Sequence, residues 1–509
     1  MKTSTGRRRF LKTAAAGAAF AGLADFSFLG RFPAVSAQEA KPDPKIVQLN
    51  GDIEPLVRVI EDTPRDKLLE EIAGRIRQGT TYREIVAALL LAGVRNVQPR
   101  PSVGFKFHAV LVVNSAHLAS LSSPDEHRWL PIFWALDYFK SSQEADVREG
   151  NWTMGPVDES RVPPPHLARK AFIAAMDRWD EPAADVAVAG LARTASSNEL
   201  FDLFARYGCR DFRSIGHKAI YVANAWRTLN CVGWQYSEPV LRSLAYALLA
   251  RENAGNPAEN DYDADRPGRK NLALAKTFRD DWQTGTIDKQ ATHDLLATIY
   301  GGSADELCSQ VAATINRGVS PQSVFDALLV GSGELLMRQP GIVGIHTLTS
   351  SNALRYAYSA CSDEETRKLL LLQNAAFLPL FRGAMTSRGN VGEDKIEGLE
   401  PAEIPSDSKA ALDAIFADVA NNKKEAARKT LAYARANPQP HDFINRARTL
   451  TFLKGRDTHD YKFSSAVLED YLNVSPPWRD RFLATSVFNL KGSGGGDNSL
   501  VQRTRAALG

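Results

Sequence analysis

The sequence predicts an all-α protein built from two similar helical halves. Apolar residues recur with the 3.6-residue period of a helix over long stretches, and no convincing run alternates with the two-residue period of a strand. Helix-starting signals precede these stretches. In addition, two long parts of the chain resemble each other at a nearly constant spacing. We therefore expect an internally duplicated, up-and-down helical array.

The chain begins with a segment typical of twin-arginine export. Residues 7–12 read Arg-Arg-Arg-Phe-Leu-Lys, which fits the pattern read by the twin-arginine translocase, the expected partner during export. An Ala/Gly-rich stretch follows, and Val35-Ser36-Ala37 offers small residues for cleavage after Ala37. We expect residues 1–37 to be a signal peptide and the mature protein to be periplasmic or secreted. Because this route carries folded proteins, it favours a cofactor loaded in the cytoplasm.

Charge and hydropathy argue against two classes of partner. The chain has 62 basic and 59 acidic residues, of which residues 1–37 hold six and one, so the mature part has 56 and 58 and a net charge of −2. This balance gives no sign of nucleic-acid binding. A membrane helix near the start is disfavoured by Asp25 and weak hydrophobicity. The best later candidate, residues 85–94, falls short of the roughly 18 apolar residues that a stable membrane span needs.

The first two predicted helices have clear boundaries. Thr63 and Pro64 read as a cap and a first helical residue before an apolar 3.6-residue pattern, and Gly79 ends that pattern. Thr81 and Glu84 form a capping box that opens a second helix through Leu91. This helix–glycine–cap–helix pattern is the unit that recurs later in the chain.

The recurrence supports a duplication. Asp66 aligns with Asp305 at a spacing of 239 residues, and the match continues through both helices. A slip of one residue then aligns the histidines and asparagines His108 with His346 and Asn114 with Asn352. A second stretch, 242 residues apart, pairs Arg193 with Arg435, Phe201 with Phe443, Arg206 with Arg448, and His217 with His459. We expect residues 52–250 to superpose on residues 290–480.

Composition divides the mature chain into four parts. Residues 38–250 form the first helical half, residues 251–289 a polar linker and loop, residues 290–485 the second half, and residues 486–509 a flexible Gly-rich tail. The four cysteines leave two alternatives open, because a Cys209–Cys231 bridge and four free thiols are equally compatible with their spacing; the others are Cys308 and Cys361.

The duplication sorts the nine histidines. His108 and His346 are mates, as are His217 and His459, and four equivalent imidazoles from facing helices are a natural metal site in a bundle. The alternative is that each is a hydrogen-bonded core histidine. His441 is set aside because its mate is Glu199. The histidines without a histidine mate are expected on surfaces or loops: His117, His127, His166 and His293.

Three further residues complete the predicted site. Lys462 follows His459 by three positions, so the two side chains share a helix face. A protonated lysine beside a bound cation would be repelled, so Lys462 is predicted to be neutral, displaced or modified; the alternative is a solvated surface lysine. Asn114 and Asn352 are predicted to orient the imidazoles. Motifs for other chemistries, such as G-x-S-x-G, a phosphate loop, H-E-x-x-H or C-x-x-C-H, are absent from the sequence.

Four segments around these histidines resemble the questin oxidase-like family of helical oxygenases. They are Phe107-His108-Ala-Val-Leu, Gly216-His217-Lys-Ala-Ile-Tyr-Val-Ala, Ile345-His346-Thr-Leu-Thr-Ser and Asp457-Thr-His459-Asp-Tyr-Lys462, within roughly residues 100–475. The resemblance implies an all-helical fold and oxidation of polycyclic aromatic ketones or phenols. It also implies a non-haem iron held by four histidines and a carboxylated lysine, here His108, His217, His346, His459 and Lys462.

The leading interpretation is an exported metal-dependent oxidoreductase, a mononuclear non-haem iron oxygenase acting on an aromatic or phenolic substrate. Imidazoles with one oxygen ligand suit Fe(II) or Mn(II) better than a structural zinc, so Fe(II) is expected, with Mn or Zn as alternatives. Two other functions stay open. One is a non-catalytic helical scaffold or binding protein, and the other is a hydrolase whose metal activates water.

Overall fold

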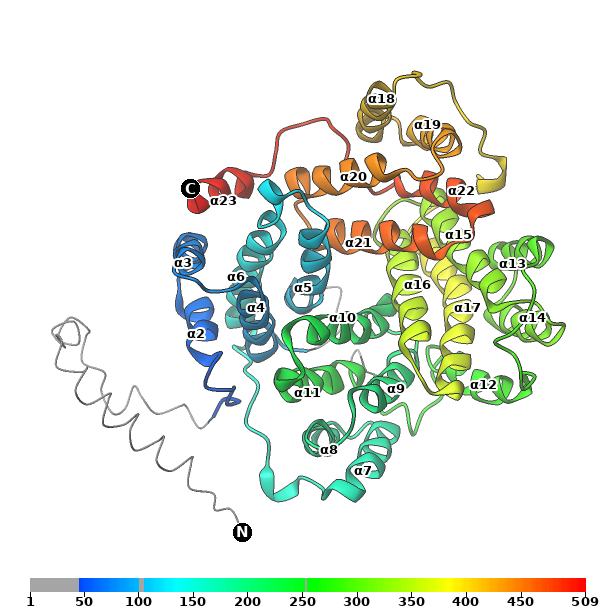
Figure 1. Cartoon of the computed structure of the whole chain (residues 1–509). Coiled ribbons are helices and arrows are strands. Elements are labelled where there is room, and N and C mark those ends of the chain that lie inside the picture. Colours follow the sequence, from blue (N-terminus) through cyan, green and yellow to red (C-terminus); the bar gives the residue numbers. More distant parts are fainter. Residues whose placement is uncertain (1–44, 100–104, 252–253) are drawn as a thin grey trace, which may run out of the picture.

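The computed structural model describes residues 45–99, 105–251 and 254–509, and within these ranges the regular structure is helical (Figure 1). The one β pairing in the described ranges is an isolated bridge between Thr286 and Val319. The all-α prediction is therefore confirmed. The predicted signal peptide, residues 1–37, lies outside the described residues. In the part of the chain that the structure covers, no helix has the length and apolar character needed to cross a membrane.

The helices follow one another in two runs separated by a single shorter helix. The first run is α2 (Glu54–Asp62), α3 (Arg65–Arg77), α4 (Tyr82–Asn96), α5 (Phe105–Leu121), α6 (Leu130–Glu149), α7 (Pro165–Arg178), α8 (Glu181–Ala192), α9 (Ser197–Gly208), α10 (His217–Val232) and α11 (Ser237–Leu248). After α12 (Arg266–Leu274), the second run is α13 (Lys289–Gly301), α14 (Ala304–Asn316), α15 (Pro321–Arg338), α16 (Ile342–Ala360), α17 (Glu364–Thr386), α18 (Ser408–Asn421), α19 (Lys423–Ala436), α20 (His441–Lys454), α21 (Thr458–Asn473) and α22 (Pro476–Ser486). The chain ends with α23 (Ser499–Leu508).

Local sequence explains where these helices begin. Thr81 and Glu84 form the predicted capping box at α4, since the Thr81 hydroxyl accepts from the Glu84 amide and the Glu84 carboxylate accepts from the Thr81 amide. Ser303 and Glu306 form a second capping box at α14. α3 begins one residue later than predicted, because Pro64 has an extended ψ of 146° and is the N-cap of the helix.

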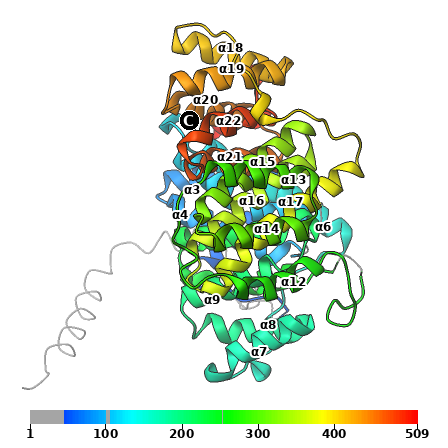
Figure 2. The same cartoon turned by 90° about the vertical axis from the view of Figure 1, so that its right-hand side faces the viewer.

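The helices of the two runs pack in the same order. α2 packs on α4 as α13 packs on α15, and the pairs α5–α6, α7–α8 and α8–α11 have counterparts in α16–α17, α18–α19 and α19–α22. The pairs α7–α8 and α18–α19 lie at opposite ends of the molecule (Figure 2). This shared order is what a duplicated chain would produce. The superposition of residues 52–250 on residues 290–480 stays a prediction.

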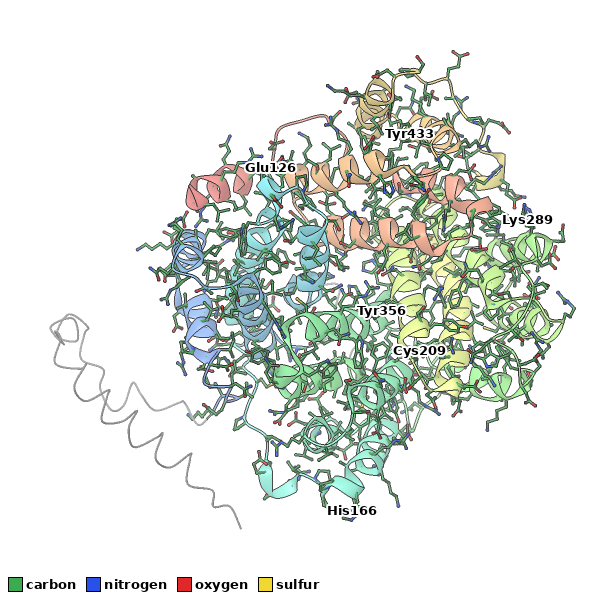
Figure 3. The ribbon with its side chains drawn as sticks, in the orientation of Figure 1. Glu126, His166, Cys209, Lys289, Tyr356 and Tyr433 are labelled. Atoms are coloured by element: carbon green, nitrogen blue, oxygen red, sulfur yellow. The ribbon has the colours of Figure 1, made fainter. Side chains whose placement is uncertain are left out.

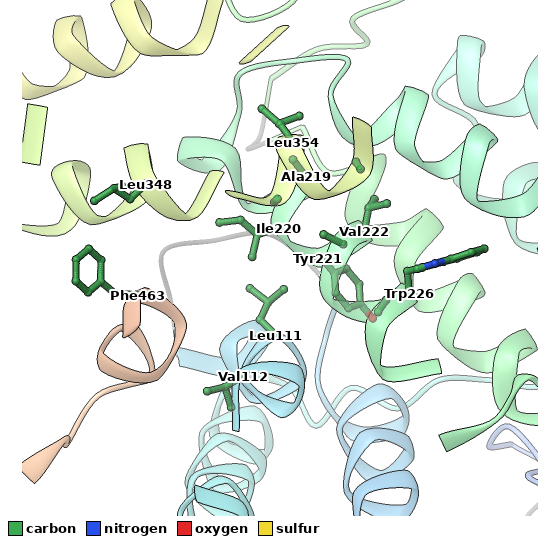
Figure 4. Packing of buried hydrophobic residues seen from close by; sticks show 14 of the residues in the cluster. Leu111, Val112, Ala219, Ile220, Tyr221, Val222, Trp226, Leu348, Leu354 and Phe463 are labelled. Carbon is green, nitrogen blue, oxygen red and sulfur yellow. The ribbon is translucent and has the colours of Figure 1, made fainter. Parts of the chain in front are cut away.

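Four helices meet at the centre, where α5 and α16 each contact both α10 and α21. Leu111 of α5 faces Ile220 of α10, and Phe463 of α21 lies near Leu348 of α16 (Figure 4). All four side chains are buried. Since burial of apolar surface contributes roughly 25 cal/mol per Å², these contacts hold the four helices together and bring their beginnings to one region.

The predicted linker and the predicted flexible tail each contain a helix. The linker of residues 251–289 contains α12, and the predicted tail of residues 486–509 contains α23, which packs on α3 and α6. Arg503 of α23 forms an ion pair with Glu70 at 2.7 Å, and Val501 is buried beneath it. A partner helix more than 400 residues away along the chain therefore orders a segment whose composition predicts mobility.

The cysteine alternatives are resolved in favour of free thiols. All four cysteines are unpaired, and Cys209, Cys308 and Cys361 are buried. Cys209 lies inside the molecule, whereas His166 lies at its edge (Figure 3). Burial raises the pKa of the Cys209 thiol to about 12, which keeps it protonated and unreactive at neutral pH.

Candidate metal centre

Four histidine side chains converge at the centre of the molecule. His108 lies in the first turn of α5, His217 begins α10, His346 lies near the start of α16, and His459 near the start of α21. The Nε2 atom of His217 lies 2.8 Å from that of His108 and 3.2 Å from that of His346. One nitrogen from each of the four rings lies within 4.8 Å of the others.

This spacing fits one metal ion. Imidazole nitrogens bonded to a first-row ion at about 2.0–2.3 Å lie roughly 3–5 Å from one another. The His459 ring completes the cluster, because its centroid lies 4.8 Å from that of His108 and 5.1 Å from that of His346. The prediction that these four histidines come together is therefore confirmed, and the cluster could bind a metal.

In three of the rings, a hydrogen bond holds the Nδ1 atom, which is the nitrogen that points away from the cluster. Nδ1 of His217 donates to the Ser214 carbonyl at 2.5 Å, and Nδ1 of His346 donates to the Ile342 carbonyl at 2.6 Å. Nδ1 of His459 contacts the Asp457 carboxylate at 2.5 Å. A proton held on Nδ1 leaves the lone pair on Nε2, which is the atom that faces the other rings. Hydrogen-bonded imidazoles of this kind are typical of metal ligands.

Burial keeps the imidazoles neutral. It lowers the pKa of His108, His217 and His346 well below the usual value, and the positive charges of Lys462 and of neighbouring rings lower it further. The pKa of His459 is also lowered, mainly by burial, although the Asp457 carboxylate opposes the shift. Neutral imidazole is the form that binds a metal, so the cluster is ready to act as a ligand set at neutral pH.

Lys462 lies beside this cluster without a partner. It follows His459 by one helical turn on α21, its side chain is buried, and its Nζ atom has no hydrogen-bond partner among the residues that the structure describes. Burial lowers the pKa of Lys462 to about 7, partly opposed by Asp457. Nε2 of His459 is likewise buried without a partner. A buried amine and a buried nitrogen with nothing to bind are costly, and an added ion with its ligands would satisfy both.

The two asparagines that were predicted to orient the imidazoles form hydrogen bonds with other groups. Asn114 Nδ2 donates to Asn224 Oδ1 at 3.3 Å, and Asn352 Nδ2 donates to Asp470 Oδ1 at 3.0 Å. They therefore join α5 to α10 and α16 to α21, about two turns beyond the histidines, and the prediction that they orient the imidazoles is wrong. The groups that do so are the Ser214 and Ile342 carbonyls and Asp457.

Three of the four histidines predicted on surfaces or loops, His127, His166 and His293, are at least partly exposed, and so is His441, which is set aside as a ligand. His166, His293 and His441 are exposed, and His127 is partly exposed. His117 differs, because it is nearly buried on α5 and its Nδ1 lies 3.0 Å from the hydroxyl of Tyr82. The ring of Trp129 lies at an angle against the ring of Tyr82. Because both rings come from outside α5, the sequence of α5 alone does not predict that His117 is buried.

Asp470, which accepts a hydrogen bond from Asn352, is predicted to make the stability of the protein depend on pH. This carboxyl is fully buried and its Oδ2 has no partner; burial, aided by the charge of Glu469, raises its pKa from 3.8 to about 7. The folded state therefore binds the proton more tightly, and this contribution to stability is present below about pH 4 and is lost as pH rises to about 7.

Asp470→Asn should remove the loss of stability that ionisation of this carboxyl causes as pH rises. The free energy of unfolding of the variant, relative to the wild type, should grow as pH rises from 4 to 7 and level off above it, by on the order of 4 kcal/mol. Urea unfolding of the metal-free proteins across this range measures it. A difference that stays constant with pH would show that Asp470 ionises in the folded protein as it does in the unfolded one.

A left-handed segment positions His217. Ser214, Ile215 and Gly216 have φ angles of +51°, +47° and +81°, and the first two lack the freedom of glycine. At Gly216 a Cβ would lie 2.0 Å from the Ser350 hydroxyl of α16, one turn beyond His346. The segment therefore depends on glycine both for its backbone angle and for the close approach of α10 and α16.

Gly216→Ala should strain this segment and push α16 away. We expect the free energy of unfolding to fall by about 2–4 kcal/mol, measured by urea unfolding of the metal-free protein. Gly301→Ala is the matched control, since Gly301 ends α13 with open space around it, and it should change stability by less than about 0.5 kcal/mol. Equal effects of the two substitutions would contradict the strain at Gly216.

Comparison with protein-family models, with curated proteins and with solved structures found no match for this chain. The class of site is therefore defined by its own geometry, which is a cluster of three buried histidines and one partly exposed histidine at the meeting point of four helices. The resemblance to the questin oxidase-like family stays a hypothesis.

Proposed function

We propose that this protein is an exported metal-dependent oxidoreductase, a mononuclear non-haem iron oxygenase that acts on an aromatic or phenolic substrate. The observation that carries the proposal is the set of four neutral imidazoles, three of them buried and that of His459 partly exposed, beside a buried amine with no partner among the described residues. His108, His217, His346 and His459 would hold the ion, and Lys462 would complete the set. A bound iron ion would supply the one-electron chemistry that dioxygen needs to react with an organic molecule.

The donor set supports iron or manganese over zinc. A structural zinc takes four ligands in a closed tetrahedron and needs no fifth. Here Lys462 offers a fifth donor on the same helix as His459, and a five-donor set of imidazoles with one oxygen suits Fe(II) or Mn(II). The signal predicted in residues 1–37 agrees with this, since a protein that folds before export can acquire its metal in the cytoplasm.

In the proposal, Lys462 acts as a carbamate. Its neutral amine would attack the carbon of carbon dioxide, form an N–C bond, and release one proton to solvent. The product is an anion that offers oxygen to the ion in place of a repelled ammonium. The burial of Lys462 favours the neutral amine that this reaction requires, and the absence of a hydrogen-bond partner leaves that amine free to react.

Oxygen consumption tests the proposed reaction. The tag-free protein, reconstituted with Fe(II) without air, should consume dioxygen in proportion to substrate when offered a panel of phenols and polycyclic aromatic ketones. The His441→Ala variant should behave as the wild type, because this exposed histidine lies outside the cluster. Hydrolysis of esters or amides by the zinc-loaded protein, without oxygen uptake, would instead support the hydrolase alternative. Absence of both activities would favour a binding protein.

A further inference from the structure

A cavity of about 330 Å³ lies away from the four histidines, where the end of α7 meets α9, α12 and α17. None of the four histidines lines it. Its size is within the range of small-molecule sites. One wall is apolar, formed by Leu272 of α12, Leu369 of α17 and the loop residues Pro257 and Ala258. Arg210 also lines the cavity.

Within the described residues, the guanidinium of Arg210 has no acidic partner in hydrogen-bonding distance. Its Nη1 donates to the Met176 carbonyl at 2.7 Å and its Nη2 donates to the Leu248 carbonyl at 3.4 Å, whereas its Nε is buried with no hydrogen-bond partner among the described residues. The nearest carboxylate oxygen, on Asp211, lies 3.8 Å away. The guanidinium lies over the ring of Trp179, 3.8 Å from the ring centroid. An arginine keeps its charge in such surroundings, so Arg210 presents a positive charge to the cavity.

The acidic residues nearby are already engaged. Asp211 accepts from Lys218 at 2.8 Å, and Asp265 accepts from Arg213 through both carboxylate oxygens at 2.6 Å. Asp177 accepts from the hydroxyl of Tyr207 at 2.9 Å. Asp177 keeps its charge, because a hydroxyl is neutral, and it also lines the cavity. None of the three carboxylates is hydrogen-bonded to Arg210 in the described part of the chain, so the remaining N–H groups of its guanidinium are left for an added anion.

The backbone that carries Arg210 is fixed. Gln373 of α17 donates to the Cys209 carbonyl at 2.5 Å, and the side chain of Asn271 on α12 donates in turn to Gln373 at 2.7 Å. Gly268 lets α12 approach closely, because a Cβ at this position would lie 2.2 Å from the Arg210 carbonyl. The arginine is thus held in place beside the cavity before any ligand arrives, which lowers the entropic cost of binding.

We propose that this cavity binds a small organic carboxylate with an apolar body. The carboxylate pairs with the guanidinium of Arg210, and the apolar body lies against Leu272 and Leu369. A planar carboxylate matches the geometry of a guanidinium, and the apolar wall favours a ligand that is otherwise uncharged. This inference does not depend on the metal centre or on the reaction proposed for it.

Titration calorimetry on the full-length, tag-free protein tests the site with 2-naphthoate and its neutral counterpart 2-naphthamide. We expect 2-naphthoate to bind with a Kd of about 0.1–1 mM, and 2-naphthamide at least about 10-fold more weakly. Arg210→Met should abolish this difference by removing the charge. Arg169→Met, at an exposed arginine outside the cavity, should preserve it.

Leu272→Trp provides a second variant that leaves Arg210 in place. Leu272 is 36% exposed, so a larger side chain can be accommodated in the fold while it fills the mouth of the cavity. We expect 2-naphthoate binding to weaken at least about 10-fold. Equal binding of acid and amide to the wild type, unchanged binding to Leu272→Trp, or no saturable binding below about 10 mM would each overturn the proposal.

Discussion

His217→Ala should abolish stoichiometric metal binding. His217 is fully buried, and its Nε2 lies 2.8 Å from that of His108 and 3.2 Å from that of His346, so it joins the ligands of the two halves. Loss of a residue that only orients a ligand typically costs 10- to 100-fold in metal affinity, so loss of the ligand itself should cost more than about 100-fold. Metal analysis after dialysis against a weak chelator measures the change.

Two controls separate this effect from misfolding. His441→Ala removes an exposed histidine, and His117→Ala removes a nearly buried one on the same helix as His108. Both should keep their metal, and His117→Ala should lose stability instead. If His117→Ala releases metal as completely as His217→Ala, metal binding reflects the general integrity of the core and not the histidine cluster.

Lys462→Met should have two opposite effects. In the metal-free protein it replaces a buried, unpartnered amine by an apolar side chain of similar length, so the free energy of unfolding should rise by about 1–4 kcal/mol. In the presence of metal it removes the proposed oxygen ligand, and affinity should fall by at least about 10-fold. Urea unfolding and chelator competition, both at neutral pH, measure the two effects.

The two measurements together show whether Lys462 is a metal ligand or only lies next to the metal site. A lysine that remained an ammonium would repel the ion, so its replacement would raise metal affinity together with stability. Lys462→Arg is the matched control, because it keeps a cation that cannot form a carbamate, and it should lose metal without gaining stability. Higher metal affinity in Lys462→Met would contradict the role proposed for Lys462.

The sequence reveals the four histidines because they recur. Each one alone resembles an ordinary core histidine, and only the pairing of His108 with His346 and of His217 with His459 gives them a shared place in the fold. The burial of Lys462 could be anticipated from its position one turn after His459. The two histidine pairings and the burial of Lys462 are all inferred from residue type and spacing, which can be read from the sequence directly.

The groups that orient the imidazoles could not be predicted in the same way. The Ser214 and Ile342 carbonyls belong to the backbone, so no residue type signals them. Asp457 gives a weak signal, as an acidic N-cap two residues before His459. The ordering of α23 likewise rests on the contact of Arg503 with Glu70, and contacts between residues so far apart are invisible to local patterns.

The metal centre is tested by X-ray absorption on tag-free protein that is purified after growth in iron-supplemented medium and analysed for metal content. We expect about one first-row metal ion per chain, surrounded by nitrogen and oxygen ligands at about 2.0–2.3 Å, with the scattering pattern of several imidazoles. Protein that holds no stoichiometric metal even after anaerobic reconstitution with Fe(II), or an ion with sulfur ligands, would contradict it.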